Sequence, residues 1–247
     1  MLSFTGLFLN RERRLHDAWW VAIFLAILTA ALLPALLLSI QMQHELSVWE
    51  QAGIIVIATL IVQLLRKRPF SEVTGEVNAH ALMHLGAGMA LGFLLMAAPA
   101  AALWIGGFVQ FSLATLRSAP LIAAVTLMAG VAFAEELLFR GVLFQRLIAA
   151  VGEWPAQIVV GLLFVLTHLG NPGMDGATQM WAGVNIFLAS VLFGKAFLRS
   201  KGLALPIGLH FMANVTQGVL LGFGTETFEQ GAAPMDLRFM VGGSVGF

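Results

Sequence analysis

The chain contains no cysteine, and only 11% of its 247 residues are charged. The absence of thiols excludes disulfide bonds, thiolate metal sites and cysteine nucleophiles. A soluble domain usually carries about 25% charged residues, so this chain has too few polar side chains to cover a surface that faces water. Its 13 basic and 13 acidic side chains cancel, so no overall field recruits nucleic acid.

The chain is rich in long apolar runs. Hydrophobic residues make up 59% of it, and the mean hydropathy is +0.90. The clearest run extends from Trp19 to Ile40 without a charged side chain, and a helix of about 20 residues crosses a bilayer. The runs are continuous rather than alternating, which favours helices over a β-barrel. The predicted fold class is therefore all-α, a polytopic transmembrane helical bundle.

Seven segments are predicted to be membrane helices. The first is too long for the apolar part of a signal peptide, so we expect it to remain as an anchor. No internal repeat or low-complexity linker divides the chain, and we expect one membrane-embedded domain over residues 1–247. The predicted segments are 18–40, 48–65, 80–104, 119–148, 155–169, 177–198 and 202–223.

The basic residues between the segments predict the orientation, because cytoplasmic loops carry an excess of Lys and Arg. With a cytoplasmic N-terminus, all of them except Arg117 and Arg238 fall on the inner side. We therefore expect an integral protein of the cell (inner) membrane with its N-terminus in the cytoplasm. The inner set is Arg11, Arg13, Arg14, Arg66, Lys67, Arg68, Arg140, Arg146, Lys195, Arg199 and Lys201.

Two adjacent carboxylates stand out in the fourth segment, because ionisable groups inside membrane helices are costly and often functional. Glu136 and Arg140 have i, i+4 spacing and can pair on one face of a helix. Glu135 points about 100° away from Glu136, so it can act while its neighbour is neutralised. The alternative is a plain ion pair near the cytoplasmic end of the helix.

Two later segments also carry polar side chains. His168 ends an apolar stretch, and His210 and Asn214 share a face by their i, i+4 spacing. Considered alone, His168 is more often a core or interfacial histidine. Polar residues such as His210 and Asn214 often serve only to join helices.

Helix lengths predict which of these residues can meet. If a turn at 152–155 joins two antiparallel helices at the inner face, Glu135 and His168 both lie about 25 Å from it. They can meet provided that the first helix continues unbroken past Arg140. His210 lies about 12 Å from the inner end of its own helix, so we expect the 152–155 hairpin to protrude into the cytoplasm.

A second cluster has metal-binding spacing but is interpreted as non-functional. Glu76, His80 and His84 follow at i, i+4 and i+8, which would stack them on one helical face and could bind a metal. They lie just after a basic cluster at the inner interface, where such side chains are ordinary. His16 and His44 are interpreted as interfacial.

Three motifs occur in order on separate apolar segments: Glu-Glu-x-x-x-Arg, Phe-x-x-x-His and His-x-x-x-Asn. Together they resemble the CPBP intramembrane proteases, which include type II CAAX prenyl endopeptidases and bacteriocin-processing and immunity proteins. The resemblance covers about residues 118–224, the expected motif-bearing core. The matching residues are Glu135, Glu136 and Arg140 with Gly141 following, then Phe164 and His168, then His210 and Asn214 within the run 205–211.

The family commonly continues after a Gly-Gly-rich stretch into a final apolar helix, the eighth. Residues 241–247 resemble that stretch. The resemblance therefore leaves the eighth helix outside the given sequence or absent.

The resemblance implies an intramembrane endopeptidase that hydrolyses a peptide bond with a glutamate-activated water. Burial raises a carboxylate's pKa, which suits Glu135 as general base near neutral pH, while Glu136 and Arg140 would hold the helix. In a zinc version, His168 and His210 are ligands together with Glu135 or Asn214. In a metal-free version, His210 and Asn214 stabilise the oxyanion. Sequence leaves both versions open.

The expected partners are a peptide or membrane-protein substrate, prenylated or not, and the lipid bilayer, with no nucleic acid. A non-catalytic membrane immunity or scaffold protein is an alternative that would keep the same polar cluster for helix packing. A proton-linked transporter is less favoured, because no internal repeat is present.

Overall fold

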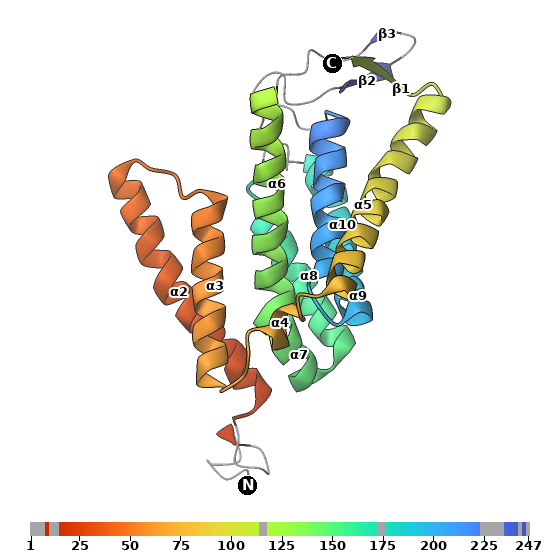
Figure 1. The fold of residues 1–247 in the computed structure, drawn as a ribbon. Helices are drawn as coiled ribbons and strands as arrows, with labels where there is room; N and C mark the ends of the chain where they lie inside the picture. Colours follow the sequence, from red (N-terminus) through yellow and green to blue (C-terminus); the bar gives the residue numbers. More distant parts are fainter. Residues whose placement is uncertain are drawn as a thin grey trace. The chain divides into compact units, whose positions relative to one another are not determined.

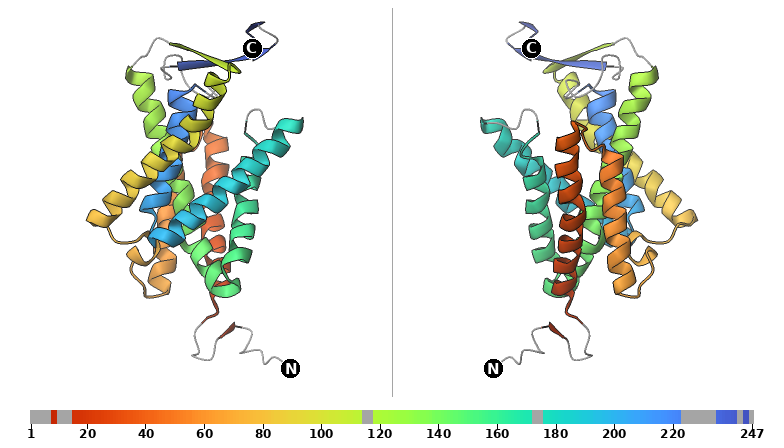
Figure 2. Two further views of the ribbon diagram at one scale, coloured as in Figure 1. Left: turned by 90° about the vertical axis from the view of Figure 1, so that its right-hand side faces the viewer. Right: turned by 90° about the vertical axis from the view of Figure 1, so that its left-hand side faces the viewer.

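The computed structural model describes residues 8–9, 15–113, 118–171, 176–222, 235–241 and 244–245 (Figures 1 and 2). The chain divides into two compact units, each described by itself. Unit 1 comprises Met1–Val77 with Ala134–Leu203, and unit 2 comprises Asn78–Phe133 with Ala204–Phe247. The single domain expected over residues 1–247, with its core at 118–224, stays a prediction.

Unit 1 is built from helices and begins with an antiparallel pair. The first two long helices among its described residues, α2 and α3, are joined by a short turn, and a capping box between Ser47 and Glu50 fixes the start of α3. The end of α6 passes through a π-helical turn, η1, into α7, and α8 and α9 follow. The bounds are α2 (Asp17–Met42), α3 (Val48–Leu65), α4 (Ser71–Thr74), α6 (Ser118–Leu138, from residue 134 in this unit), η1 (Phe139–Leu143), α7 (Phe144–Val151), α8 (Glu153–His168) and α9 (Gly176–Ser200).

Unit 2 packs α5 along α10 and closes with a small sheet (Figure 1). The Asn78 side chain accepts a hydrogen bond from the Ala81 amide and caps α5. A three-stranded antiparallel sheet, order β1-β2-β3, pairs Val109 with Phe239. The bounds are α5 (Ala79–Ile105), β1 (Val109–Leu113), the first part of α6, α10 (Ala204–Asn214), the π-helical η2 (Val215–Leu220), β2 (Met235–Val241) and β3 (Ser244–Val245).

The helical bundle predicted from the sequence is confirmed, and the seven segment boundaries agree with the helices to within a few residues. Five helices of the described residues are long and apolar enough to cross a membrane. The shorter α8 has 16 residues, and α10 has 11 before η2 begins. The chain therefore fits a multi-pass membrane protein, while the count of seven spans stays a prediction.

The contacts of unit 1 gather several residues of the predicted inner side at one end. Arg66 at the end of α3 and Arg146 on α7 both approach Glu72, and the amide of Leu203, after α9, donates to the Thr74 carbonyl. The compartment that this end faces stays a prediction. Arg11, Arg13, Arg14 and Arg117 lie outside the described residues.

Two expectations about helix continuity were wrong. The helix that carries Glu135 is broken at Gly141, whose ψ of −129° is not helical. Glu76 lies before α5, which begins at Ala79, so it cannot share a helical face with His80.

The small sheet had no counterpart in the predicted fold. Ser244 and Val245, from the Gly-Gly-rich stretch, form β3, whereas residues 242–243 and 246–247 lie outside the described part. The sheet adds a short β element to an otherwise helical unit 2.

Candidate active site

Glu135 and His168 come together inside unit 1, as the helix lengths predicted. Glu135 Oε2 lies 3.9 Å from His168 Nε2. One side chain comes from the end of α6 and the other from the last residue of α8. Both are partly accessible, at 26% for Glu135 and 19% for His168. The pair is therefore partly accessible, although Glu135 Oε2, the oxygen nearest His168, is itself buried.

The orientation of the His168 ring follows from the residues before it. His168 Nδ1 lies 2.7 Å from the Phe164 carbonyl, and because a carbonyl only accepts, Nδ1 carries the hydrogen. The Phe164 ring also packs against the imidazole, with centroids 4.6 Å apart. A neutral His168 consequently turns the lone pair of Nε2 toward Glu135.

The neighbouring Glu136 is engaged in an ion pair, as its spacing predicted. Arg140 Nη1 donates to Glu136 Oε1 at 3.3 Å, and both side chains are completely buried. Arg140 Nη2 donates to the carbonyl and to Oγ of Ser190, each at 2.8 Å. Ser190 lies on α9 and was missed from the sequence, because an isolated serine in an apolar helix carries no motif. This network fixes α6 against α9.

Three phenylalanine rings surround the buried guanidinium. Its central carbon lies 5.9 Å from the ring centre of Phe139, 5.0 Å from that of Phe164 and 5.3 Å from that of Phe193. Aromatic faces attract cations, more strongly when water is excluded. Phe164 therefore has two roles: its ring contacts Arg140 and its carbonyl orients His168, which gives the Phe-x-x-x-His spacing a physical reason.

In unit 2, His210 is buried on α10 and Asn214 is half-buried one turn later. Glycines let α10 approach α5 at backbone distance. A Cβ placed on Gly88 would lie 2.3 Å from the Leu205 carbonyl oxygen, and one on Gly92 would lie 2.3 Å from that of Leu209. The Gly-x-x-x-Gly spacing of these two residues is a sequence signal of close helix packing.

The first and the third of the three motifs each lead into a π-helical turn. The Glu-Glu-x-x-x-Arg motif enters η1 at Phe139–Leu143, and η2 at Val215–Leu220 begins directly after Asn214. Such turns are rare and are often found at functional sites. The backbone therefore marks the same two places that the motifs mark.

The described residues bring together only part of the donor set that the zinc hypothesis requires. Within each unit, the described residues include no group of three or more His, Asp and Glu side chains that could hold a metal ion. Glu135 and His168 supply two donors of the kind that zinc prefers, and His210 is described with the other unit. Glu76 and His80 are exposed and His84 is half-buried, and their interpretation as non-functional stays a prediction.

The fold and these contacts define a multi-pass helical protein with an ordered Glu–His pair beside a buried Glu–Arg–Ser network. Residues 117–216 match the family model described as type II CAAX prenyl endopeptidase Rce1-like. The match confirms the resemblance indicated by the three motifs, and all the candidate residues lie within it. It supports a CAAX-type intramembrane endopeptidase in general terms. No curated protein and no solved structure matches the chain.

Proposed function

We propose that the chain is an intramembrane endopeptidase in which Glu135 activates the water that attacks a peptide bond. The observation that carries the proposal is the 3.9 Å approach of Glu135 Oε2 to His168 Nε2. That separation is longer than a direct hydrogen bond, so the two side chains are close neighbours that a water can contact together. Glu136 is engaged by Arg140, and we assign the proton transfer to Glu135.

The chemistry requires one proton to move twice. Glu135 takes a proton from the attacking water as the water oxygen bonds to the scissile carbonyl carbon, and later gives it to the leaving amine as the C–N bond breaks. Negative charge develops on the carbonyl oxygen and needs hydrogen-bond donors. We assign that role to His210 and Asn214, from the third motif. The substrate is a peptide or membrane-protein segment in the bilayer.

A zinc version of the same site uses the same residues. His168, Glu135 and His210 would hold the ion, which would supply a Lewis acid for the carbonyl oxygen. The hydrogen bond from His168 Nδ1 to the Phe164 carbonyl supports this version, because metal-binding histidines usually donate their other N–H to such a partner.

The test of the general base is Glu135→Gln in full-length protein reconstituted with a membrane-presented peptide. Loss of a general base lowers the rate by about 10²- to 10⁴-fold, and we expect an unchanged melting temperature. Glu45→Gln makes the same chemical change at an exposed position and serves as the matched control. Full activity in Glu135→Gln would refute the assignment.

Metal content tests the zinc version without measuring cleavage. We expect about one zinc per purified chain in that version, lost from His168→Ala and His210→Ala. Active protein without zinc would establish the metal-free version. A folded chain that cleaves no peptide yet carries protons across liposomes would instead support a transporter, and one with neither activity would support a scaffold.

A further inference from the structure

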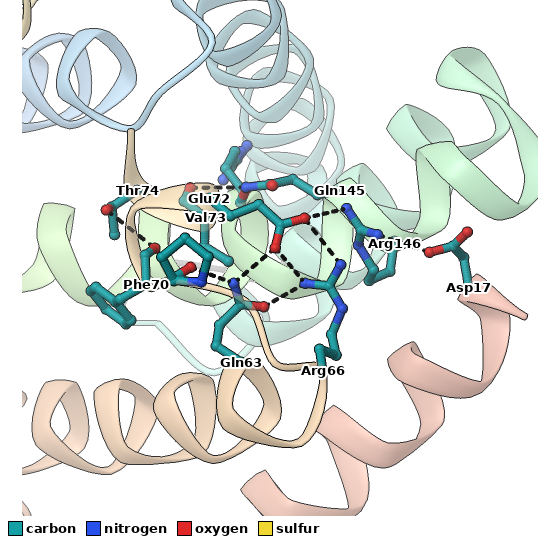
Figure 3. A network of polar contacts seen from close by, with 11 residues as sticks. Asp17, Gln63, Arg66, Phe70, Glu72, Val73, Thr74, Gln145 and Arg146 are labelled. Carbon is teal, nitrogen blue, oxygen red and sulfur yellow. Dashed lines mark hydrogen bonds and ion pairs between the residues drawn. The ribbon is translucent and has the colours of Figure 1, made fainter. Parts of the chain in front are cut away.

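A set of polar side chains joins α2, α3, α4 and α7 of unit 1, close to the break at Gly141 that follows Glu135 and Glu136 (Figure 3). We call it the α4 clasp, because its members hold the short helix α4 in place. No motif contains any of them. The members are Asp17, Gln63, Arg66, Glu72, Gln145 and Arg146.

The first half of the clasp ties α4 to its neighbours by charge. Glu72 accepts two hydrogen bonds of 3.0 Å from Arg66, in a two-point contact. Arg146 on α7 lies 3.7 Å from Glu72 and donates to Asp17 at 2.9 Å. Gln63, which is buried, donates to Glu72 at 3.1 Å. The end of α3 is thereby connected through α4 to α7, and the start of α2 is connected to α7 directly.

The second half of the clasp is a single amide. Gln145 Nε2 donates to the Val73 carbonyl at 2.9 Å and to the Arg140 carbonyl at 3.1 Å, so both of its hydrogens are used. In a regular helix the Arg140 carbonyl would accept from the Phe144 amide. At the kink the Phe144 amide donates to the Gly141 carbonyl instead, and Gln145 supplies a donor to Arg140.

Packing at the kink adds a steric constraint. Val73 is buried, and a Cβ on Gly141 would lie 3.2 Å from its Cγ1. Arg140 is consequently held at both ends, its carbonyl by Gln145 and its guanidinium by Glu136 and Ser190. A shift of the Arg140 backbone has to move the helix end that carries the glutamates.

We propose that Gln145 is a positioning residue, which sets the approach of Glu135 to His168 by fixing the kink at Gly141. The inference rests on the proposed function, because it takes this pair as the reacting site. Gln145 touches neither side chain of the pair and acts through the Arg140 backbone. Its contribution is geometric, and reaction rates are sensitive to displacements of about 1 Å.

Cross-linking tests this placement without any cleavage assay. The chain has no cysteine of its own, so a Glu135→Cys/His168→Cys protein offers one pair of thiols within each chain. The side-chain tips, rather than the Cβ atoms, are the atoms that lie 3.9 Å apart, so a short bifunctional thiol reagent is used to join the two cysteines in place of a direct disulfide. We expect Gln145→Met to slow this cross-linking about tenfold. Gln51→Met is the matched control: Gln51 also donates to a carbonyl, that of Leu46 at 3.0 Å, in a local contact.

An unchanged cross-linking rate in Gln145→Met would overturn the inference, as would absence of cross-linking when Gln145 is present. If Gln145→Met does not fold, Gln145→Asn repeats the test with an amide too short to reach both carbonyls. Gln145→Lys keeps N–H donors of similar reach and should restore part of the rate. Equally slow cross-linking in the Lys and Met variants would show that the hydrogen bonds donated by residue 145 do not set the placement.

Kinetics supply the second readout. We expect Gln145→Met to lower kcat by about 10- to 100-fold with KM within about twofold, since the substrate contacts remain. A loss matched by the fraction of unfolded protein would indicate a merely structural role and refute the inference. An active Glu135→Gln protein would refute the proposed function alone, because the cross-linking result would still decide the placement.

Discussion

The two units hold their candidate residues by different physical means. In unit 1, the Glu135–His168 pair lies beside a buried ion pair and two further hydrogen bonds of Arg140. In unit 2, close packing fixes α10, the helix that carries His210 and Asn214, because glycines let the backbones of α5 and α10 approach each other. Charges in an apolar interior tolerate little loss of a partner, whereas close packing tolerates little added volume.

The glycines of the two units sharpen this contrast. In unit 1, a Cβ on Gly161 would meet the Phe187 ring at 2.6 Å, and one on Gly194 would meet the Gln157 side chain. Side chains can turn away. In unit 2, a Cβ on Gly208 would meet the carbonyl oxygen of Leu85 at 2.2 Å, and backbone of a packed helix cannot move alone. Charge removal should therefore damage unit 1 most, and added methyl groups should damage unit 2 most.

The largest effect is expected from Arg140→Ala. It leaves the Glu136 carboxylate buried without its cation, and breaking a buried pair in this way costs about 3–5 kcal/mol. Thermal unfolding in detergent, with the soluble fraction on size exclusion, measures the loss.

The control removes both charges at once. Glu136→Gln/Arg140→Met keeps the volume of the two side chains, and such replacements of buried ion pairs are often neutral in stability. If the double variant is as unstable as Arg140→Ala, then the Ser190 hydrogen bonds and the phenylalanine contacts of Arg140, rather than its charge partner, dominate unit 1.

A smaller effect is expected from Gly92→Ala in unit 2. The added methyl would lie 2.3 Å from the Leu209 carbonyl oxygen and 2.8 Å from the Ala213 amide. Separating α5 from α10 should cost about 1–3 kcal/mol and displace His210. Chemical denaturation and the rate of peptide cleavage measure the two consequences.

Gly86 provides the matched control on the same helix. Its Cβ would meet nothing within 4 Å, so Gly86→Ala should cause no loss and removes a flexible residue from the helix. If both alanine variants behave alike, close packing does not position α10. The contrast between the units would then fail.

The sequence predicted the parts of this arrangement that repeat locally. Helix boundaries follow from long apolar runs, and the Glu136–Arg140 pair follows from i, i+4 spacing. The Glu135–His168 approach was predicted from helix lengths, although the assumed unbroken helix was wrong. The kink is held by Gln145 through Val73, 72 residues away in the chain. A contact of that separation has no periodicity to reveal it.

The third prediction concerns the pH dependence of unit 1. Burial raises the pKa of Glu72, but hydrogen bonds from Arg66 and Gln63, with the charges of Arg66 and Arg146, outweigh it and hold the pKa below the ordinary 4.5. A lowered pKa in the folded state stabilises the protein above the unfolded value and ceases to do so as pH falls through the folded one. The α4 clasp should therefore weaken in acid.

The measurement compares wild type with Glu72→Gln at two pH values. At neutral pH we expect the variant to be less stable by about 1–2 kcal/mol, a modest figure because the carboxylate is partly exposed. Below pH 4.5 the difference should shrink as Glu72 becomes protonated, while other carboxylates affect both proteins equally. A difference that is constant across this range would exclude the charge of Glu72 as the source.

The smallest effect is expected at Lys195, which pairs with Glu153 and lies 4.3 Å from the centre of the Trp154 ring. Both charged side chains are about 40% exposed, and exposed pairs contribute about 0–1 kcal/mol. Lys195→Met should thus change neither stability nor cleavage by more than the spread between preparations. A loss as large as that of Arg140→Ala would mean that burial does not distinguish the Lys195–Glu153 pair from the Glu136–Arg140 pair, and charge alone would explain how this unit is held.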